Sequence, residues 1–174
     1  MTDQVLADTT PGPSGAAYNA WYSCPLKTAA ACLLDPYIDQ VNDQTVLMTS
    51  VALPLQDGGK VIGVIGIDIS LAALQALAES ANRNLYEGQG DISFISPAGL
   101  LAAHTRDAAQ LGKPMDNADQ TQASALRQAL QAGQPSVVSS EQSIGVMQPV
   151  QPIPGAKTWG CLLYTSDAAD DTPC

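Results

Sequence analysis

Five aromatic and acidic residues near the start of the chain have the composition of a cation-binding site. They are Trp21, Tyr22, Tyr37, Asp39 and Asp68. The face of an aromatic ring attracts a partly desolvated cation by about 0.5–2 kcal/mol, and carboxylates add charge-assisted hydrogen bonds. Together these residue types predict a pocket for an ammonium group, if the fold brings them to one cavity.

Each of the five residues also has a structural alternative. Trp21 and Tyr22 could be core anchors, and Tyr37 could pack a loop. Asp39 could be a solvated loop carboxylate. Asp68 precedes a predicted helix, where an acidic side chain stabilises the helix N-terminus. Only their joint position in the fold separates these alternatives from a ligand site.

Residues for catalysis or metal binding are not evident in the sequence. His104 is the only histidine and stands without a cysteine or acidic residue at metal-ligand spacing. The sequence also has no glycine-rich phosphate loop and no nucleophile elbow. We therefore expect no enzymatic activity, no metal and no cofactor, and a structural role for His104.

Cys24 and Cys32 lie close together in a stretch rich in turn formers. In an exported domain, such a pair predicts a disulfide. The alternative is two free thiols. The other two cysteines, Cys161 and Cys174, fall in the C-terminal tail.

Composition and charge limit the classes of partner. The 174 residues are 45% hydrophobic and 14% charged, which is typical of a globular protein, and the net charge is −10. This acidic balance excludes a basic nucleic-acid surface and weakly favours cationic ligands. The sequence contains no apolar run long enough to cross a membrane and does not open with a signal-peptide pattern.

The clearest local pattern is a β-hairpin over residues 46–69. Residues 46–55 alternate, with Leu47 and Thr49 facing one way and Met48 and Ser50 the other. Residues 57–59 read Asp-Gly-Gly, a tight-turn signal, and 60–69 form the second strand.

A helix and a second set of strands follow the hairpin. Ser70 is the predicted N-cap of a helix ending near Asn84. Its predicted inward face holds Leu71, Leu74, Leu77, Ala78, Ala81 and Leu85. Strands are then predicted at 91–96, 100–105, 136–140, 144–150 and from about 159, with a helix over 121–132 that turns Ala123, Leu126 and Leu130 inward. Hairpins with helices outside a mainly antiparallel sheet indicate an α+β fold.

Three segments together resemble the double Cache (PAS-like) sensor domains of bacterial methyl-accepting chemotaxis receptors. The first is Trp21-Tyr22 followed by DPYID at 35–39. The second is VLMTSVALPLQDGGKVIGVIGIDISLAAL at 46–74. The third is DISFISPAGLLAAH at 91–104 followed by LGKP at 111–114. The resemblance covers roughly residues 18–159.

The resemblance implies two tandem PAS-like modules with antiparallel sheets flanked by helices, incomplete at both ends. Residues 1–88 would be the C-terminal part of the membrane-distal, ligand-binding module. Residues 89–160 would be the incomplete membrane-proximal module. Residues 161–174 read CLLYTSDAADDTPC, which resembles a translated sequencing adapter, so we interpret them as an artefact; the alternative is a genuine polar tail.

The resemblance also implies the function of an extracytoplasmic sensor domain in a transmembrane chemoreceptor. The parent protein would be membrane-anchored and homodimeric, with this chain in the periplasm. A loop over residues 18–45 would close on the ligand, and the proximal module would relay the signal. The alternatives are the sensor domain of a histidine kinase or a diguanylate cyclase, and a stand-alone periplasmic binding protein.

One departure from the family pattern bears on the ligand. In members that bind amino acids, an arginine two positions before the Trp-Tyr pair binds the ligand carboxylate. That position is Asn19 here, and an earlier tyrosine position is Ser14. Because an arginine fork is hard to replace in carboxylate recognition, we expect a small amine as ligand and an amino acid second.

Overall fold

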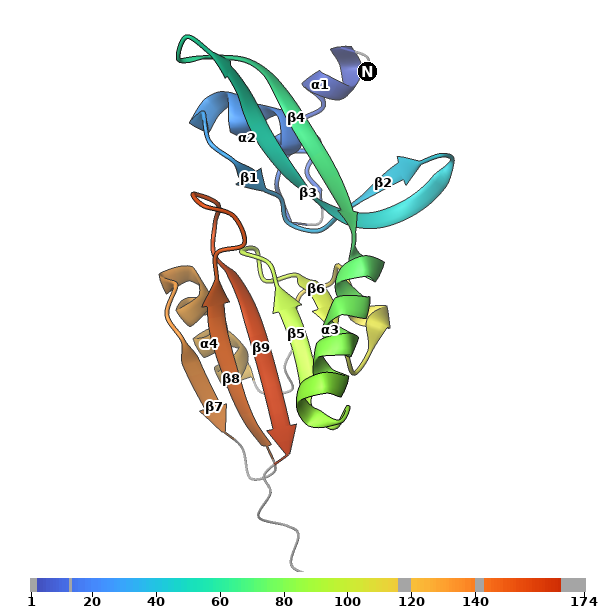
Figure 1. Cartoon of the computed structure of the whole chain (residues 1–174), viewed down its shortest axis with the longest axis vertical. Helices are drawn as coiled ribbons and strands as arrows, with labels where there is room; N and C mark the ends of the chain where they lie inside the picture. Colours follow the sequence, from blue (N-terminus) through green and yellow to red (C-terminus); the bar gives the residue numbers. More distant parts are fainter. Residues whose placement is uncertain (1–2, 13, 116–119, 140–142, 167–174) are drawn as a thin grey trace, which may run out of the picture.

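Two antiparallel sheets make up most of the described chain, and one helix runs from the first to the second. The computed structural model describes residues 3–12, 14–115, 120–139 and 143–166. Figure 1 shows the sheet of β1–β4 at one end of the molecule and the sheet of β5–β9 at the other, with α3 (Leu71–Tyr86) leading from β4 toward β5. The predicted α+β fold of paired sensor modules is confirmed.

The first sheet is built around one long central strand. Its strands are β1 (Cys32–Leu33), β2 (Tyr37–Val41), β3 (Gln44–Asp57) and β4 (Lys60–Ser70), and short helices α1 (Asp3–Ala7) and α2 (Ala20–Thr28) precede them. Met48 of β3 pairs with Tyr37 on one side and with Ser70 on the other. β2 and β4 therefore lie on opposite edges of β3, and the predicted hairpin is confirmed.

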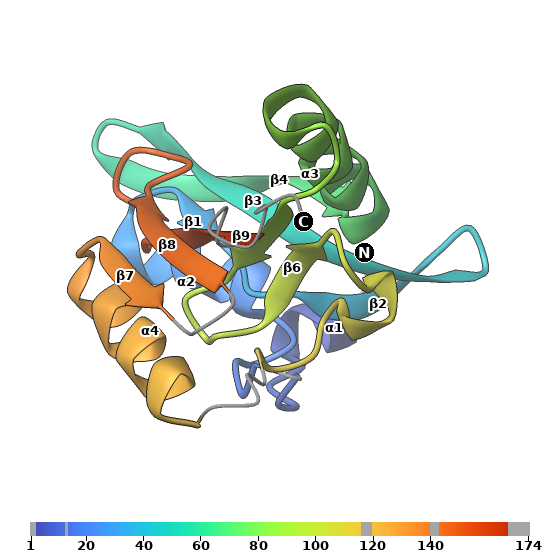
Figure 2. The same cartoon turned by 90° about the horizontal axis from the view of Figure 1, so that it is seen from below.

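The second sheet has the order β6-β5-β9-β8-β7. Its strands are β5 (Asp91–Ile95), β6 (Leu101–His104), β7 (Ser136–Ser139), β8 (Ser143–Val150) and β9 (Trp159–Ser166). Helix α4 (Gln120–Ala132) packs Leu126 and Leu130 against Met147 and Leu162 on one face. Helix α3 packs Ala78 against Ile92 on the other face, and Figure 2 shows the two helices on opposite sides of the sheet.

The tail that resembles an adapter read contributes to this sheet. Residues 161–166 belong to β9, which pairs with β5 on one edge and with β8 on the other. Residues 167–174 lie outside the described residues. The interpretation of 161–174 as an artefact stays a prediction, as do the module boundaries at 88 and 160.

Helix α3 begins as predicted but buries a different face. The Ser70 hydroxyl accepts a hydrogen bond from the Ala73 backbone N–H, which confirms the N-cap. Leu77 and Leu85, however, are 58% and 69% exposed, so their predicted inward orientation is wrong. The buried positions in their place are Gln75 and Asn82.

The burial of Gln75 has a clear physical reason. Its side-chain amide donates to the backbone carbonyl of His104 at 3.0 Å and accepts from the His104 N–H at 2.8 Å. His104 lies on β6, an edge strand of its sheet. Gln75 thus satisfies backbone groups that an edge strand leaves unpaired, and apolar periodicity alone carries no signal for this role.

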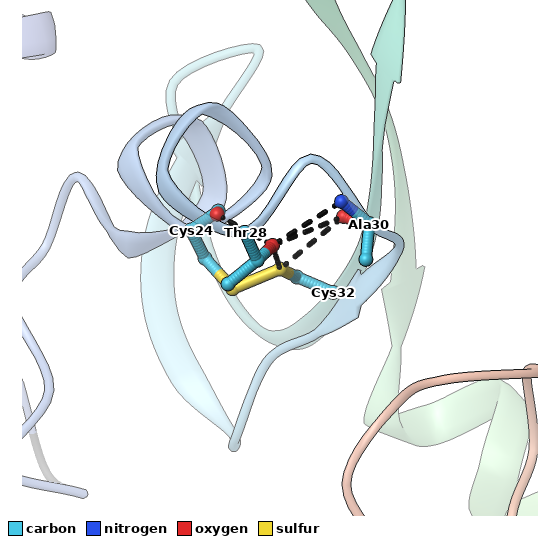
Figure 3. Close-up of a disulfide and its surroundings, with 4 residues drawn as sticks. All are labelled: Cys24, Thr28, Ala30 and Cys32. Atoms are coloured by element: carbon cyan, nitrogen blue, oxygen red, sulfur yellow. Dashed lines mark hydrogen bonds between the residues drawn. A yellow bond between two sulfur atoms is a disulfide. The ribbon is translucent and has the colours of Figure 1, made fainter.

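The predicted disulfide is present between Cys24 and Cys32. It joins α2 to β1 (Figure 3). The Thr28 hydroxyl lies beside it and bonds the Cys24 carbonyl at 2.9 Å and the Ala30 N–H at 3.3 Å. The bridge therefore holds α2 close to the first sheet.

Candidate ligand-binding site

The register of the first sheet places three of the predicted site residues on one face. Asp68 of β4 is directly opposite Ser50 of β3, and Tyr37 and Asp39 of β2 are opposite Met48 and Val46. Opposed residues of antiparallel strands share a face, and residues two apart on a strand do too. Asp68, Tyr37 and Asp39 therefore face the same side of the sheet.

A chain of hydroxyl hydrogen bonds connects Tyr37 to Asp68. The Ser50 hydroxyl donates to Asp68 Oδ1 at 2.5 Å. The Tyr37 hydroxyl lies 2.5 Å from Ser50 Oγ and 3.5 Å from Asp68 Oδ1. Because the Ser50 proton is directed to the carboxylate, Tyr37 donates to Ser50.

Tyr18 adds a second tyrosine to this face. Its hydroxyl donates to Asp39 Oδ1 at 2.6 Å, and its ring meets the Tyr37 ring edge to face at a centroid distance of 6.2 Å. Tyr18 and Ser50 were not predicted from the sequence as site residues. The strand alternation gave a signal for Ser50, which shares the face of Met48, whereas Tyr18 lies in an irregular segment without a periodic pattern.

The electrostatics of this face are negative. Burial, followed by the hydrogen bond and the charge of Asp39, raises the pKa of Tyr18. Burial, with the nearby charges of Asp68 and Asp39, raises the pKa of Tyr37 to about 12. Within the described residues, no lysine, arginine or histidine forms a salt bridge with either carboxylate. The two phenols stay neutral at physiological pH, so no salt bridge or phenolic proton transfer among the described residues balances the two carboxylates.

We refer to Tyr18, Tyr37, Asp39, Ser50 and Asp68 as the tyrosine–carboxylate network. Asp39 is half-buried and Asp68 is exposed. In addition, every hydrogen bond that the described residues make to these two carboxylates goes to Oδ1. Oδ2 of each carboxylate therefore has no hydrogen-bond partner among the described residues.

Trp21 and Tyr22 lie on α2, which packs on β3 and β4. Both are half-buried, and their rings contact each other at a centroid distance of 5.6 Å. No hydrogen bond or ring contact among the described residues joins them to the tyrosine–carboxylate network. The structure thus bonds Tyr37 to Asp68 and links Asp39 to Tyr37 through Tyr18, while Trp21 and Tyr22 form a separate pair.

Asn19, at the position of the family's arginine, has a structural contact. It is buried, and its side-chain amide donates to the Leu6 carbonyl at 2.7 Å. The amide N–H of Asn19 therefore attaches the segment before α2 to α1 instead of being directed at a ligand.

A cavity of about 330 Å³ adjoins the two tyrosines. The residues that line it come from the loop before α2, from the disulfide region and from the loop between β8 and β9. They include Tyr18, Tyr37, Cys24, Asp35, Ala156 and Lys157. The cavity therefore lies where the first sheet meets the second.

His104 lies in a different polar cluster, on the second sheet. Its Nδ1 is 2.9 Å from Ser93 Oγ and 3.6 Å from Asp91 Oδ1. A hydrolytic triad needs the acid and the serine on opposite ring nitrogens. Because Ser93 and Asp91 both approach Nδ1, this cluster lacks the geometry of such a triad.

Neither a metal site nor a membrane-spanning helix is found in the described part of the chain. No group of three or more histidine, cysteine, aspartate or glutamate side chains there is placed to hold a metal ion. The helices described above are too short or too polar to cross a bilayer.

Comparison with known proteins identifies the kind of domain. Residues 13–76 match the family described as methyl-accepting chemotaxis protein-like, first PDC sensor domain. The chain is 52% identical over 169 residues to the methyl-accepting chemotaxis protein TlpQ of Pseudomonas aeruginosa, a match that covers 97% of this chain and 24% of that protein.

Solved structures of chemoreceptor domains share the fold. Methyl-accepting chemotaxis protein X matches with a TM-score of 0.66 and 25% identity, over 84% of this chain and 54% of that one. The periplasmic sensory domain of Campylobacter jejuni Tlp1 matches with a TM-score of 0.65 and 17% identity, over 87% and 56%. The ligand-binding domain of P. aeruginosa PctC in complex with GABA matches with a TM-score of 0.56 and 24% identity, over 84% and 59%.

These matches show which kind of sensor domain the chain resembles and how much of each relative it covers. The chain spans about a quarter of the curated relative and about half of each solved domain. The Tlp1 neighbour is a periplasmic sensory domain of a chemoreceptor, and the disulfide of this chain suits that oxidising compartment. The chain is a periplasmic sensor domain of the double Cache (PDC) type, similar over nearly its whole length to part of a methyl-accepting chemotaxis protein.

Proposed function

We propose that this sensor domain detects a small amine at the tyrosine–carboxylate network, with an amino acid as the second candidate. The observation that carries the proposal is the pair Asp39 and Asp68, held by neutral hydroxyl groups and unpaired with any cation of the described residues. An ammonium group supplies the missing positive charge.

An ammonium group also matches the donor and acceptor pattern. It carries three N–H donors and no acceptor, while a carboxylate accepts through both of its oxygens. Oδ2 of Asp39 and Oδ2 of Asp68 have no partner among the described residues. The rings of Tyr18 and Tyr37 provide the nearby aromatic surface.

Solvent exposure sets the condition for tight binding. Asp68 is exposed, and ion pairs in water contribute at most about 1 kcal/mol. High affinity therefore requires closure of residues 18–45 over the site, which would remove water from both carboxylates. Trp21 and Tyr22 lie in this segment and would be brought toward the ligand in the closed state.

An amino acid ranks second because its carboxylate needs a cationic partner. Solved relatives are complexes of PctC with GABA and of Pseudomonas fluorescens CtaA with L-leucine. In this chain Asn19 is engaged with Leu6. Lys157 is a cation beside the adjoining cavity and is the candidate partner for a carboxylate.

The test is calorimetric titration of the chain with matched ligands. Putrescine and choline carry only positive charge, leucine and γ-aminobutyrate carry both signs, and succinate carries only negative charge. We expect binding in the order amines, amino acids, then no binding of succinate. Tighter binding of succinate than of the amines would overturn the proposal.

For the whole protein, we infer a membrane-anchored, homodimeric receptor whose output is chemotaxis and which has no enzymatic activity of its own in this region. The similarity to TlpQ over nearly the entire chain supports this inference. Extending the gene sequence tests it. A transmembrane segment followed by a helical signalling domain is expected, whereas a kinase or cyclase domain, or a stop codon, would contradict it.

A further inference from the structure

Asp35 joins the two sheets through a hydrogen bond. It is half-buried in the connection between β1 and β2, and its Oδ1 accepts from the backbone N–H of Ala98 at 2.9 Å. Ala98 lies in the turn between β5 and β6. The two residues are 63 positions apart in the chain. Their hydrogen bond therefore links the first sheet, which holds the tyrosine–carboxylate network, to the second sheet.

On its own side, Asp35 has a short and constrained connection to the network. Pro36, which is fully buried, separates it from Tyr37 and restricts the backbone there. On the other side of Asp35, the Leu34 N–H donates to the Ser50 carbonyl at 3.0 Å. Ser50 also bonds Asp68 and Tyr37 through its hydroxyl. Tyr37 and Ser50 are therefore connected to the segment that holds Asp35 through one residue of chain and one hydrogen bond.

The turn between β5 and β6, which contains Ala98, is also constrained by hydrogen bonds. The Ser96 N–H donates to the Leu100 carbonyl at 2.9 Å, and the Gly99 N–H donates to the Ser96 carbonyl at 2.8 Å. The Gly99 carbonyl then accepts from the N–H of Met115, a residue of the buried core that α4 completes. A shift at Ala98 is thus passed to the core of the second sheet.

On one side of the Asp35–Ala98 bond, a cavity separates residues of the two sheet regions. The cavity of about 330 Å³ is lined by Asp35 and Tyr37 from the first sheet region and by Ala156 and Lys157 from the loop between β8 and β9. A ligand could shift the packing of the two sheets beside this cavity only if it bound two arrangements with different affinity.

We propose that Asp35 is a positioning residue that couples the state of the tyrosine–carboxylate network to the second sheet through the Ala98 N–H. The coupling to a ligand rests on the proposed function, but the mechanical link does not. Asp35 acts here without touching the ligand. Its carboxylate transmits movement of the β2 strand to the β5–β6 turn.

The first experiment measures exchange of the Ala98 amide proton by NMR, with and without saturating putrescine. In the parent chain and in Asp35→Asn, which retains an oxygen acceptor, we expect ligand to change the exchange rate at least about 5-fold, the lower range of typical couplings. In Asp35→Ala we expect binding within about 3-fold of the parent and no ligand-dependent change at Ala98.

A matched control comes from the second sheet. Asp107 Oδ1 accepts from the Ala109 N–H at 2.9 Å, a bond of the same chemistry that stays within one loop. Asp107→Ala should leave the response at Ala98 intact. The proposal is overturned if Asp35→Ala responds like the parent, or if it loses putrescine affinity more than about 10-fold, since Asp35 would then belong to the ligand site itself.

A second experiment needs no ligand. Ser50→Ala removes the hydroxyl group that links Tyr37 to Asp68. We expect it to change Ala98 exchange in the parent background and to have no further effect in Asp35→Ala. Equal effects in both backgrounds would refute the coupling. Failure of putrescine to bind the parent would instead refute the proposed function, so the two failures are distinguishable.

Discussion

Acidic side chains have different surroundings in the two sheets. Asp91 of the second sheet is buried, accepts from the Thr105 hydroxyl at 3.0 Å and has Arg106 Nε at 3.5 Å. Asp39 and Asp68 of the first sheet accept from hydroxyl and backbone groups that carry no charge. A carboxylate balanced inside the fold is part of the structure, whereas an unbalanced one remains available to a cation.

The two sheets also differ in how completely their apolar side chains are buried. In the second sheet, α4 and the strands enclose Leu126, Met147 and Leu162, each 1% exposed. In the first sheet, Ile65 and Ile67 of β4 are 52% and 61% exposed. The described residues thus complete a core around the second sheet but leave the Ile65 and Ile67 side chains of the first largely exposed.

Removing a core side chain should have the largest effect on stability. Leu126→Ala deletes buried methyl groups where the neighbouring side chains are tightly packed, and should lower the free energy of unfolding by about 2–5 kcal/mol. Ile65→Ala is the matched control and should cost about 0.5 kcal/mol or less in this chain. Chemical denaturation measures both. Equal losses would show that the first sheet is as well packed as the second.

Breaking the disulfide should destabilise the first sheet. The Cys24–Cys32 bridge closes a short loop, so replacing both residues by serine should cost about 2–3 kcal/mol through chain entropy. Cys161→Ser, at a free and half-buried thiol, should cost less. Denaturation under oxidising conditions compares them. If reduction left the parent chain's stability unchanged, the bridge would have no stabilising role.

Neutralising one network carboxylate should weaken amine binding. Asp68→Asn should lower putrescine affinity about 10–100-fold, because a charge-assisted hydrogen bond is lost. Asp91→Asn should leave affinity unchanged and lower stability, because Asp91 pairs only with its own sheet. Calorimetry and denaturation separate the two outcomes. A similar loss of affinity in both variants would end the distinction between structural and binding carboxylates.

Ionisation of the network phenols at high pH should lower the stability of the folded state, with a smaller effect than the changes above. The pKa of Tyr37 is raised to about 12, above the usual value of 10, so the folded state favours the neutral phenol. This stabilisation is present below pH 10 and is lost as the pH rises through 12. Tyr37→Phe should therefore make stability fall less steeply over that interval. An unchanged slope in the thermal melts would contradict the raised pKa.

The local elements could be predicted from the sequence because their signals are short-range. Residue alternation in 46–55 and the Asp-Gly-Gly turn predict the hairpin that β3 and β4 form. The role of Ser70 as N-cap could also be predicted from the sequence. Helix α2 was missed, since Pro25 and a short, weakly periodic sequence hide it. The inward face of α3 was wrong at Leu77 and Leu85, because the buried Gln75 and Asn82 bond the backbone carbonyls of His104 and Gly90.

Alternation, turn residues and cysteine spacing are local signals, so they predicted the fold class and the disulfide pair from the sequence, while the resemblance of three segments indicated the family. Tertiary contacts alone show which acidic residues of the described part form no salt bridge, that Tyr18 and Ser50 join Tyr37, Asp39 and Asp68, and that Asp35 reaches Ala98. These facts depend on strand register and on contacts between residues far apart in the chain. Charge balance is a property of such contacts, so residue types alone do not reveal it.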